Sequence, residues 1–340
     1  MRILITGGAG YIGSHTIVEL SKAGHEIVVI DNFSNSNRNV IKRIEHLINK
    51  KITVYDIDLR EKEKEKVISV FQKSSFDAII HFASLKSVSE SVKNPLEYYD
   101  NNISGTLNLL AVMKEFNVWN FIFSSSATVY GNSLIMPVDE SFNIGGVTNP
   151  YGSTKLFIEN ILSDLAKSDE RWRIASLRYF NPVGAHRSGI IGEDPVGIPN
   201  NLIPYLMKVA MGELECLYIY GDDYDTDDGT GVRDYIHVTD LALGHISALN
   251  YIYNSNGYNV FNLGTGVPYS VMEVITTFEK ITGEKVKYKI TNRRPGDVAQ
   301  CWSSPQLAAD KLGWKATLNL EDMLRDSWNW QKNNPDGYER

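Results

Sequence analysis

Short apolar runs alternate with longer amphipathic stretches through the first half of the chain. Each short run is rich in β-branched residues and is bounded by glycine, asparagine or charged residues, which predicts a strand. Strands that alternate with helical patterns predict a parallel sheet covered by helices on both faces. The expected strands are Arg2–Thr6, Glu26–Ile30, Ile52–Tyr55, Ala78–His81, Asn120–Ser124 and Ile174–Arg178.

The pattern changes after Arg178, where long loops rich in Gly, Pro and Asn separate the remaining helices. Ser270, followed by Glu273, predicts a capping box, and Thr239 or Asp240 is expected to cap the apolar stretch 241–249. We therefore expect an α/β protein with a doubly wound first domain, 1–180, and a smaller mixed α/β lobe, 181–340. Segments such as 235–262 are expected to return to the first domain. The charged stretch Arg60–Gln72 is expected to form a helix with a solvated face.

The composition is that of a soluble globular protein, with 340 residues, 43% of them hydrophobic and 22% charged. A net charge of −7 argues against nucleic acid as a partner. We expect no membrane span and no signal peptide, because apolar runs are short and Met1 leads directly into Ile3–Ile5 and glycines. The two cysteines, Cys216 and Cys301, are too few for a disulfide framework, which favours a reducing cytoplasm.

A glycine-rich turn follows the first expected strand at once. Gly7, Gly10 and Gly13 stand between that strand and a helical pattern, which is typical of a Rossmann-like turn that brings backbone N–H groups to a pyrophosphate. Asp31 ends the next strand, where a carboxylate can accept hydrogen bonds from an adenosine ribose and repel a 2′-phosphate. The pattern predicts binding of NAD in preference to NADP.

Tyr151 and Lys155 are four residues apart, 25 residues after Ser126. On a helix that starts near Pro150, the phenol and the ammonium would share one face. A nearby cation favours the phenolate, so we expect a lowered pKa for Tyr151, by roughly one to three units. Ser126, at the end of a strand, would reach the same substrate oxygen. These three residues are the candidate proton-handling groups.

The acidic loop 223–229 looks like the start of a calcium loop. Asp228 stands where the sharp turn needs glycine, and Asp234 where a bidentate Glu is expected. The histidines have no ligand spacing in common. No metal is predicted.

Taken together, the motifs of the chain resemble those of UDP-hexose 4-epimerases, in the extended short-chain dehydrogenase/reductase superfamily. The resemblance covers nearly the whole chain. The motifs that carry it are Thr6–Gly13, His81–Lys86, Pro95–Asn102, Ser124–Gly131, Tyr151–Lys155, Leu177–Gly184, Gly231–His237 and Arg294–Asp297.

The resemblance implies a tightly held NAD that is used and restored in each turnover. Tyr151 would take the proton of the sugar 4′-hydroxyl, Ser126 would bind the same oxygen, and Lys155 would bind the nicotinamide ribose. The expected NAD site also contains Gly7, Gly10, Tyr11, Ile12, Gly13, Asp31, Asn32, Asn35, Asp58, Leu59, Phe82, Ala83, Lys86, Asn101, Ser124 and Phe180. The expected UDP-sugar site adds Tyr179, Asn181, Asn201, Leu202, Tyr218, Tyr220, Arg233, Tyr235, Arg294, Asp297 and Cys301 to Lys86, Ser126 and Tyr151. A homodimer is also implied.

Three alternatives remain at this stage. A nucleotide-sugar 4,6-dehydratase needs an acid and a base after the residue that matches Ser126, but Ala127 and Thr128 stand there. A decarboxylase acting on UDP-glucuronate would need an added cation for the carboxylate. A catalytically silent NAD-binding sensor is the third, and the intact set of Ser126, Tyr151 and Lys155 argues against it.

Cys301 is the departure that bears most on the substrate. In the family that the chain resembles, a bulky tyrosine at this position goes with glucose and galactose, and a small residue goes with room for a 2-acetamido group. We therefore expect activity on UDP-N-acetylglucosamine and UDP-N-acetylgalactosamine as well. The other interpretation of Cys301 is a small packing residue.

Overall fold

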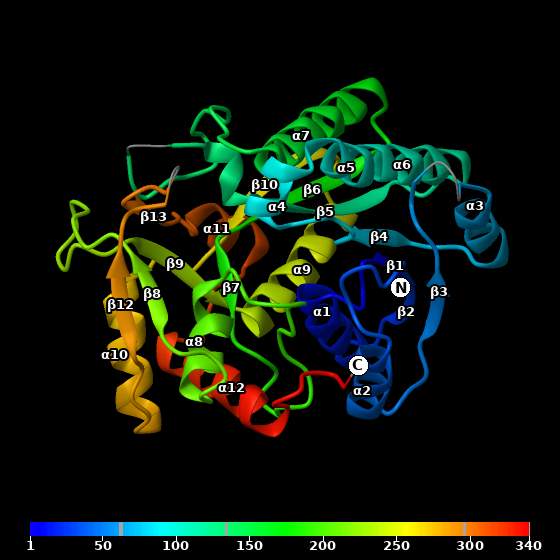
Figure 1. Ribbon diagram of the computed structural model, residues 1–340. Helices are drawn as coiled ribbons and strands as arrows, with labels where there is room; N and C mark the ends of the chain where they lie inside the picture. The colour runs from blue at the N-terminus through cyan, green and yellow to red at the C-terminus, as the bar shows by residue number, and fades with distance from the viewer. Residues whose placement is uncertain (61–63, 133–134, 295–296, 340) are drawn as a thin grey trace.

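A computed structural model describes residues 1–60, 64–132, 135–294 and 297–339. Within this part of the chain, the largest sheet has seven strands, all parallel, in the order β10-β6-β5-β4-β1-β2-β3 (Figure 1). The strands are β1 (Arg2–Thr6), β2 (Glu26–Asp31), β3 (Thr53–Asp56), β4 (Ala78–His81), β5 (Asn120–Ser126), β6 (Arg173–Tyr179) and β10 (Gly257–Leu263). The predicted doubly wound sheet is confirmed.

Helices cover both faces of this sheet, because alternate strand residues point to opposite sides. Ile3 and Ile5 of β1 belong to one apolar cluster, whereas Leu4 between them belongs to another. The first cluster includes residues of α1 (Tyr11–Lys22), α2 (Asn39–Ile48), α9 (Val238–Tyr253) and α11 (Gln306–Leu312). The second includes residues of α3 (Lys64–Lys73), α6 (Gly105–Glu115) and α7 (Pro150–Ser168). Short helical segments complete the latter layer, namely α4 (Val88–Lys93), α5 (Pro95–Tyr99), the π-helix η2 (Asp100–Ser104) and the 3₁₀-helix η3 (Ala127–Tyr130).

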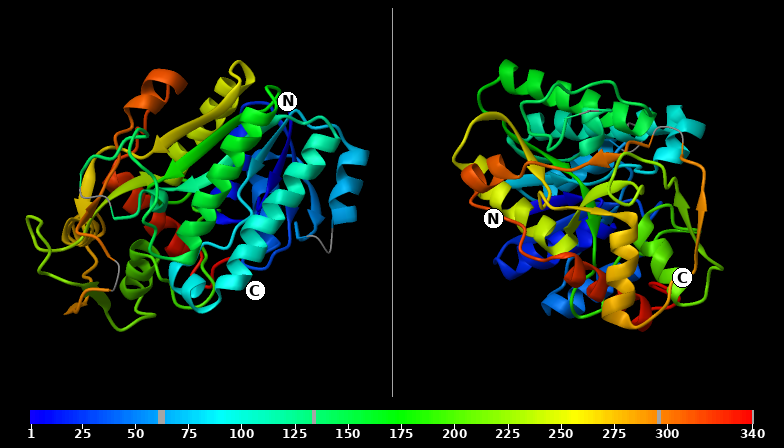
Figure 2. Two further views of the ribbon diagram at one scale, coloured as in Figure 1. Left: turned by 90° about the horizontal axis from the view of Figure 1, so that it is seen from above. Right: turned by 90° about the vertical axis from the view of Figure 1, so that its left-hand side faces the viewer.

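A smaller lobe lies beside the carboxyl ends of the strands (Figure 2). Its central strand, β9 (Val232–His237), pairs with β11 (Pro268–Ser270), β13 (Gln300–Cys301) and β7 (Asn181–Val183). A two-stranded parallel sheet joins β8 (Leu217–Tyr220) to β12 (Tyr288–Thr291). The helices α8 (Leu202–Ala210), α10 (Val271–Thr282) and α12 (Leu320–Asn333) contribute to the core of this lobe.

The expected strands are present, with bounds that shift by at most two residues. The helix expected over Arg60–Gln72 is described from Lys64 to Lys73, and residues 61–63 of that prediction lie outside the described residues. Strand β10 pairs with β6, and α9 packs against α1. The division of the chain at residue 180 stays a prediction. No helix in the described part of the chain is long and apolar enough to cross a membrane.

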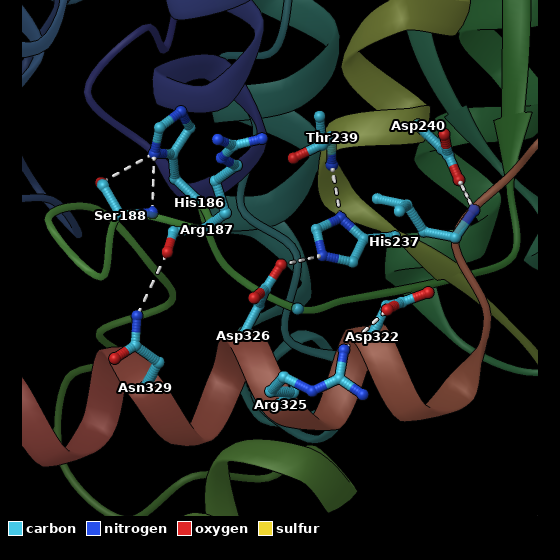
Figure 3. A network of polar contacts seen from close by, with 12 residues as sticks. His186, Arg187, Ser188, His237, Thr239, Asp240, Asp322, Arg325, Asp326 and Asn329 are labelled. Carbon is cyan, nitrogen blue, oxygen red and sulfur yellow. Dashed lines mark hydrogen bonds and ion pairs between the residues drawn. The ribbon is translucent and has the colours of Figure 1, made fainter.

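One helix cap differs from the expectation. The capping box at Ser270 and Glu273 is present, but α9 begins at Val238, and its cap is His237. The ring Nδ1 of His237 accepts from Thr239 N at 3.0 Å, and Nε2 contacts Asp326 of α12 at 3.2 Å (Figure 3). Asp240 instead accepts bonds from the backbone N–H groups of Thr317 and Leu318, both at 2.8 Å. Histidine caps are rarer than Thr or Asp caps, which is why the sequence pattern missed it.

The carboxyl-terminal segment packs against the first domain. Trp330 and Tyr338 are buried in the same apolar cluster as α1 and α2. The Tyr338 hydroxyl contacts the Gly192 carbonyl at 2.9 Å, and Asn39 of α2 donates to the Tyr338 carbonyl at 3.2 Å. The guanidinium of Arg43 lies 5.0 Å from the centre of the Tyr338 ring. Residues near the two ends of the sequence therefore share one core.

We expect a Gly13→Ala substitution to destabilise the protein by about 1–3 kcal/mol, because its Cβ would lie 2.5 Å from the Gly7 carbonyl oxygen. Gly105→Ala, also in a helix, is the control. Its Cβ would lie 3.4 Å from Leu59 Cβ, and the alanine should gain up to about 1 kcal/mol of helix propensity. Urea unfolding measures both free energies. Equal stabilities in the two variants would contradict the close approach at Gly13.

Candidate active site

The candidate residues gather at the carboxyl edge of the parallel sheet. β1 pairs with β2 on one side and with β4 on the other, so the chain connections diverge at this point. Such a reversal opens a crevice outside the strand ends, where ligands of this fold class bind. The glycine turn follows β1, Asp31 ends β2, and Phe82 follows β4. Ser124 and Ser126 lie at the end of β5.

The glycine turn has the geometry of a phosphate cradle. Gly7 has a φ of +70°, and a Cβ there would lie 2.6 Å from the Ala83 backbone nitrogen. Gly10 is the N-cap of α1, and as a glycine it has no side chain to occupy the backbone N–H groups of Ile12 and Gly13. These groups and the positive end of the helix dipole are therefore available to an anion. The turn fits a pyrophosphate.

Asp31 holds this turn and the loop that follows β2. Its Oδ2 accepts from Ala9 N at 2.9 Å, and its Oδ1 accepts from Phe33 N at 2.9 Å and from Ser36 Oγ at 3.2 Å. Burial raises the pKa of the Asp31 carboxyl, and these hydrogen bonds oppose that rise. A ribose at this place would meet a carboxylate that is already oriented.

Several other residues expected at NAD lie around the same edge. Asn32 donates to Asp58 Oδ2 at 3.0 Å, so the loops after β2 and β3 are joined. Asn35 is exposed in the loop after β2, and Leu59 is buried after β3. The Lys86 ammonium pairs with Glu193 at 3.2 Å and lies 5.9 Å from the centre of the Tyr11 ring.

The neighbour of Asn101 was missed by the sequence analysis. Asn102 is 1% exposed in the π-helix η2, a form often found at functional sites. Its amide donates to the Leu85 carbonyl and to Thr154 Oγ1, both at 3.0 Å, and accepts from Leu85 N at 2.8 Å. Asn102 therefore ties the loop after β4 to α7. Asn101 donates to Asn102 at 2.9 Å.

Tyr151 and Lys155 lie in the first turns of α7. Asn149 caps this helix by accepting from Gly152 N at 2.9 Å. Lys155 is only 2% exposed, and its ammonium donates to the Ser124 carbonyl at 2.7 Å. The same nitrogen lies 5.8 Å from the centre of the Tyr151 ring. The structure thus brings Tyr151, Lys155 and the end of β5 together.

The pKa of Tyr151 differs from the expectation. Burial raises the pKa of the phenol, and a hydrogen bond with Ser126 lowers it only in part. Burial also lowers the pKa of Lys155 to about 7, although the charge of Glu159 opposes this effect. A lysine that is only partly protonated at neutral pH stabilises a phenolate less than a full cation does. The predicted lowering of the Tyr151 pKa is therefore wrong for this site.

Tyr179 and Phe180 are more enclosed than expected. The Tyr179 hydroxyl and His245 Nε2 lie 2.5 Å apart, and Tyr179 is 5% exposed. Burial raises the pKa of this phenol, while Ser124 lowers it and Tyr151 raises it further. Phe180 is buried in an apolar cluster that Cys301 also contacts. Tyr179 therefore lies next to Tyr151 with its hydroxyl already paired.

The smaller lobe supplies the residues expected at UDP. The guanidinium of Arg294 lies 3.8 Å from the centre of the Tyr220 ring, and Arg233 donates to the Val232 carbonyl at 2.8 Å. Arg233 also pairs in register with Cys301. Further expected residues are Asn181, exposed on β7; Asn201, the N-cap of α8; Leu202, its first residue; Tyr218, exposed on β8; and Tyr235, buried on β9. Asp297 N donates to the Arg294 carbonyl at 3.2 Å; residues 295–296 between them lie outside the described chain.

Asp234 organises this lobe and was not predicted to do so. It is fully buried and accepts bonds from Thr265 N at 2.9 Å, Gly266 N at 3.0 Å and Ser303 Oγ at 2.5 Å. It therefore joins β9 to the loop before β11 and to the segment after β13.

In the acidic loop, Asp223 forms an ion pair with Arg293 at 2.7 Å.

A second buried network was also missed. Glu159 of α7 binds Arg178 of β6 through two hydrogen bonds, of 2.7 and 3.0 Å. The Tyr130 hydroxyl accepts from Arg178 at 2.9 Å and donates to Asn262 at 2.6 Å. Two features of the sequence could have indicated this network: polar residues within apolar strands, and a glutamate four residues after Lys155. The sequence pattern predicts Arg178 only as the end of a strand.

Comparisons with known proteins agree with this geometry. A family model described as GDP-mannose 4,6 dehydratase matches residues 4–327. The UDP-glucose 4-epimerase of Haemophilus influenzae is 53% identical over 338 residues, 99% of each chain. The human UDP-glucose 4-epimerase is 51% identical over 343 residues, 99% of this chain and 98% of its own. A crystal structure of UDP-glucose 4-epimerase from Bifidobacterium longum in complex with NAD+ and UDP is 52% identical, with a TM-score of 0.95 over 99% of this chain and 100% of that one.

The parallel sheet, the glycine turn and the Tyr151–Lys155 pair define the class of extended short-chain dehydrogenases/reductases. The description of the matched family model names a dehydratase. The relatives that share half of the sequence are epimerases. The chain belongs to the UDP-glucose 4-epimerase family and is an isomerase.

Proposed function

We propose that this protein interconverts UDP-glucose and UDP-galactose by NAD-dependent epimerisation at C4′, with Tyr151, Ser126 and Lys155 as the proton-handling groups. The observation that carries the proposal is the buried Lys155 ammonium, 2.7 Å from the Ser124 carbonyl and 5.8 Å from the Tyr151 ring centre. These groups lie at the same sheet edge as the glycine turn. A proton acceptor and a dinucleotide cradle thus face one crevice.

Gly7, Gly10 and Gly13 would hold the NAD pyrophosphate, and Asp31 would bind the adenosine ribose. NAD, when bound, supplies an acceptor for the C4′ hydride and a donor that returns it to the other face of the sugar. Lys155 would bind the nicotinamide ribose. Its ammonium is oriented for this by the Ser124 carbonyl.

Tyr151 takes the proton from the 4′-hydroxyl as the C4′–H bond breaks, and it returns the proton to the 4′-oxygen at the end. Ser126 donates a hydrogen bond to the same oxygen, which carries partial negative charge in the transition state. Its hydroxyl Oγ accepts from Thr128 N at 3.3 Å, and this contact orients it.

The hexose must turn over between the two transfers while the nucleotide stays bound. Arg233 and Arg294 come from separate segments and would clamp the diphosphate by charge-assisted hydrogen bonds. Tyr220 would stack on the uracil, and the Arg294 guanidinium at 3.8 Å keeps its ring in place. Asn181 and the N-terminus of α8 at Asn201 complete the anchor.

One assay tests the function directly. The purified protein is incubated with UDP-galactose without added NAD, and the formation of UDP-glucose is followed. An epimerase forms UDP-glucose until equilibrium, a sensor forms nothing, and a dehydratase forms a 4-keto-6-deoxy sugar.

Tyr151→Phe should retain the nucleotide sugar and lose at least about 100-fold in kcat, because general base catalysis contributes about 10²–10⁴-fold. The measurements are kcat for UDP-galactose and the Kd of UDP by calorimetry. Tyr253→Phe, at an exposed tyrosine of α9, is the control and should leave both unchanged. Near-normal kcat in Tyr151→Phe would remove Tyr151 from the role of base.

The substrate range is proposed to include UDP-N-acetylhexosamines because of Cys301. This residue lies on β13 beside Arg233 and contacts the cluster around Phe180. Burial raises the pKa of its thiol, while Arg233 lowers it, so the thiol is protonated at neutral pH and serves as a small neutral side chain. A small side chain leaves space for a 2-acetamido group.

Cys301→Tyr should lower kcat/KM for UDP-N-acetylgalactosamine by roughly 10-fold or more relative to UDP-galactose, because pocket volume discriminates by about 1–3 kcal/mol. Cys301→Ser keeps the side chain small and is the control. Retention of full activity on the acetylated sugar by Cys301→Tyr would show that Cys301 is only a packing residue.

A homodimer is proposed through the outer surface of α5, α6 and α7, which lie side by side on one face of the sheet (Figure 1). This surface exposes Leu96 (82%), Leu107 (46%) and Phe157 (46%). In a dimer, the same patch of each subunit would cover the patch of the other and bury these side chains.

Location in a reducing cytoplasm stays a prediction.

Phe157→Glu should shift the protein from dimer to monomer in light scattering after gel filtration, because a carboxylate in an apolar interface costs desolvation free energy. Leu243→Glu, at an exposed leucine on the opposite face of the sheet, is the control. A dimer in both variants would exclude this surface.

A further inference from the structure

Glu159 is a buried carboxylate beside the catalytic groups that the steps above do not use. It is 2% exposed on α7, four residues after Lys155, so the two side chains share one face of the helix. Its Oε1 accepts from Ser125 Oγ at 2.5 Å and from Arg178 Nε at 3.0 Å. Its Oε2 accepts from Arg178 Nη2 at 2.7 Å. The carboxylate therefore binds two neighbouring strands at once.

The partners of Glu159 are fixed in register by the sheet. Ser125 pairs with Arg178, and Arg178 pairs with Asn262, so three polar residues form a row across β5, β6 and β10. The Tyr130 hydroxyl contacts two adjacent members of this row, Arg178 and Asn262. Glu159 makes its three bonds to this row in the same rotation of α7 that directs Lys155 at the Ser124 carbonyl.

The charge of Glu159 acts on Lys155 as well. Burial lowers the pKa of Lys155, and the carboxylate of Glu159 opposes that effect. Burial, together with the charge of Lys155, lowers the pKa of His81 on β4 to about 3, so this ring is neutral. The titratable and charged groups around the pair are His81, Tyr130, Glu140, Tyr151, Arg178, Tyr179 and Tyr258. Of these, Arg178 is the cation, and it is already bound to Glu159.

We propose that Glu159 is a positioning residue of the active site, which sets the rotation of α7 and, through its charge, favours the ammonium form of Lys155. The proposal rests on the proposed function of Lys155, but its main test does not depend on turnover. A buried ion pair adds little net stability compared with apolar packing. The Arg178–Glu159 ion pair is therefore better explained by its effect on the position and the charge of Lys155 than by stability.

The test is Glu159→Gln, which keeps the shape and removes the charge. The Lys155 pKa is measured by NMR on protein with ¹³C-labelled lysine, with the resonance assigned by Lys155→Met. We expect the Lys155 pKa to fall, and the alkaline limb of the kcat profile to move to lower pH. Above that pKa, each unit of decrease leaves about one tenth of the protonated amine. An unchanged Lys155 pKa would overturn the proposal.

A second variant covers the case in which Glu159→Gln leaves Arg178 unpaired and fails to fold. Glu159→Gln with Arg178→Met removes both charges, and the Lys155 pKa should still lie below that of the wild type. If Glu159 were only a partner for Arg178, this double variant would regain the wild-type pH profile. Glu279→Gln, at a pair with Lys285 on α10, is the control and should change neither quantity.

The outcomes separate this proposal from the proposed function. If the wild type does not convert UDP-galactose but Glu159→Gln still lowers the Lys155 pKa, the function is wrong and the positioning role stands. If the wild type is active and the Lys155 pKa is the same in all variants, the positioning role is wrong and the function stands.

Discussion

The reversal of strand order at β1 determines where the cofactor and the substrate can bind in this molecule. β1 is hydrogen-bonded to β2 on one side and to β4 on the other, so the connections leave it in opposite directions. Because all seven strands are parallel, their carboxyl ends meet at one edge, and six of them carry candidate site residues there. The glycine turn after β1 and the serines after β5 are neighbours in space for this reason. The strand topology, independent of the side chains, therefore brings the cofactor cradle and the proton acceptor to the same crevice.

The same edge imposes an electrostatic cost. Lys155, Glu159 and Arg178 are each at most 3% exposed between α7 and the sheet, where charges lose their hydration. An apolar layer at this level would stabilise the fold as well or better. The chain instead places a row of polar residues across three strands, pairs Arg178 with Glu159, and bonds the Lys155 ammonium to the Ser124 carbonyl. Buried polar residues also join distant segments elsewhere. Asn102 bonds the loop after β4 to α7, and Asp234 bonds strands and loops of the smaller lobe. The site is held in place because Glu159, Asn102 and Asp234 are each bonded to more than one segment.

The sequence predicts well those features that depend on local pattern. The strands Arg2–Thr6 and Ala78–His81 have the predicted bounds because apolar runs end there at glycine or polar residues. The common face of Tyr151 and Lys155 follows from helical spacing. Other features depend on contacts between distant segments. The raised pKa of Tyr151 comes from burial, and the roles of Asn102, Asp234 and Asn262 come from partners many residues away. No residue type has a distinct propensity for the π-helix that contains Asn102. Strand β10 was not predicted because polar residues interrupt its apolar pattern.

The carboxyl-terminal segment has a consequence for the synthesis of the protein. The core around α1 and α2 includes residues of β10, α9, Trp330 and Tyr338, all from the last third of the chain. While a ribosome is still making that part, the first six strands of the sheet have an open edge at β6, and α1 and α2 cover only part of one apolar face. Such surfaces associate with other chains until they are buried. The first domain, although encoded first, can therefore complete its core only after residues of the last third of the sequence have been made.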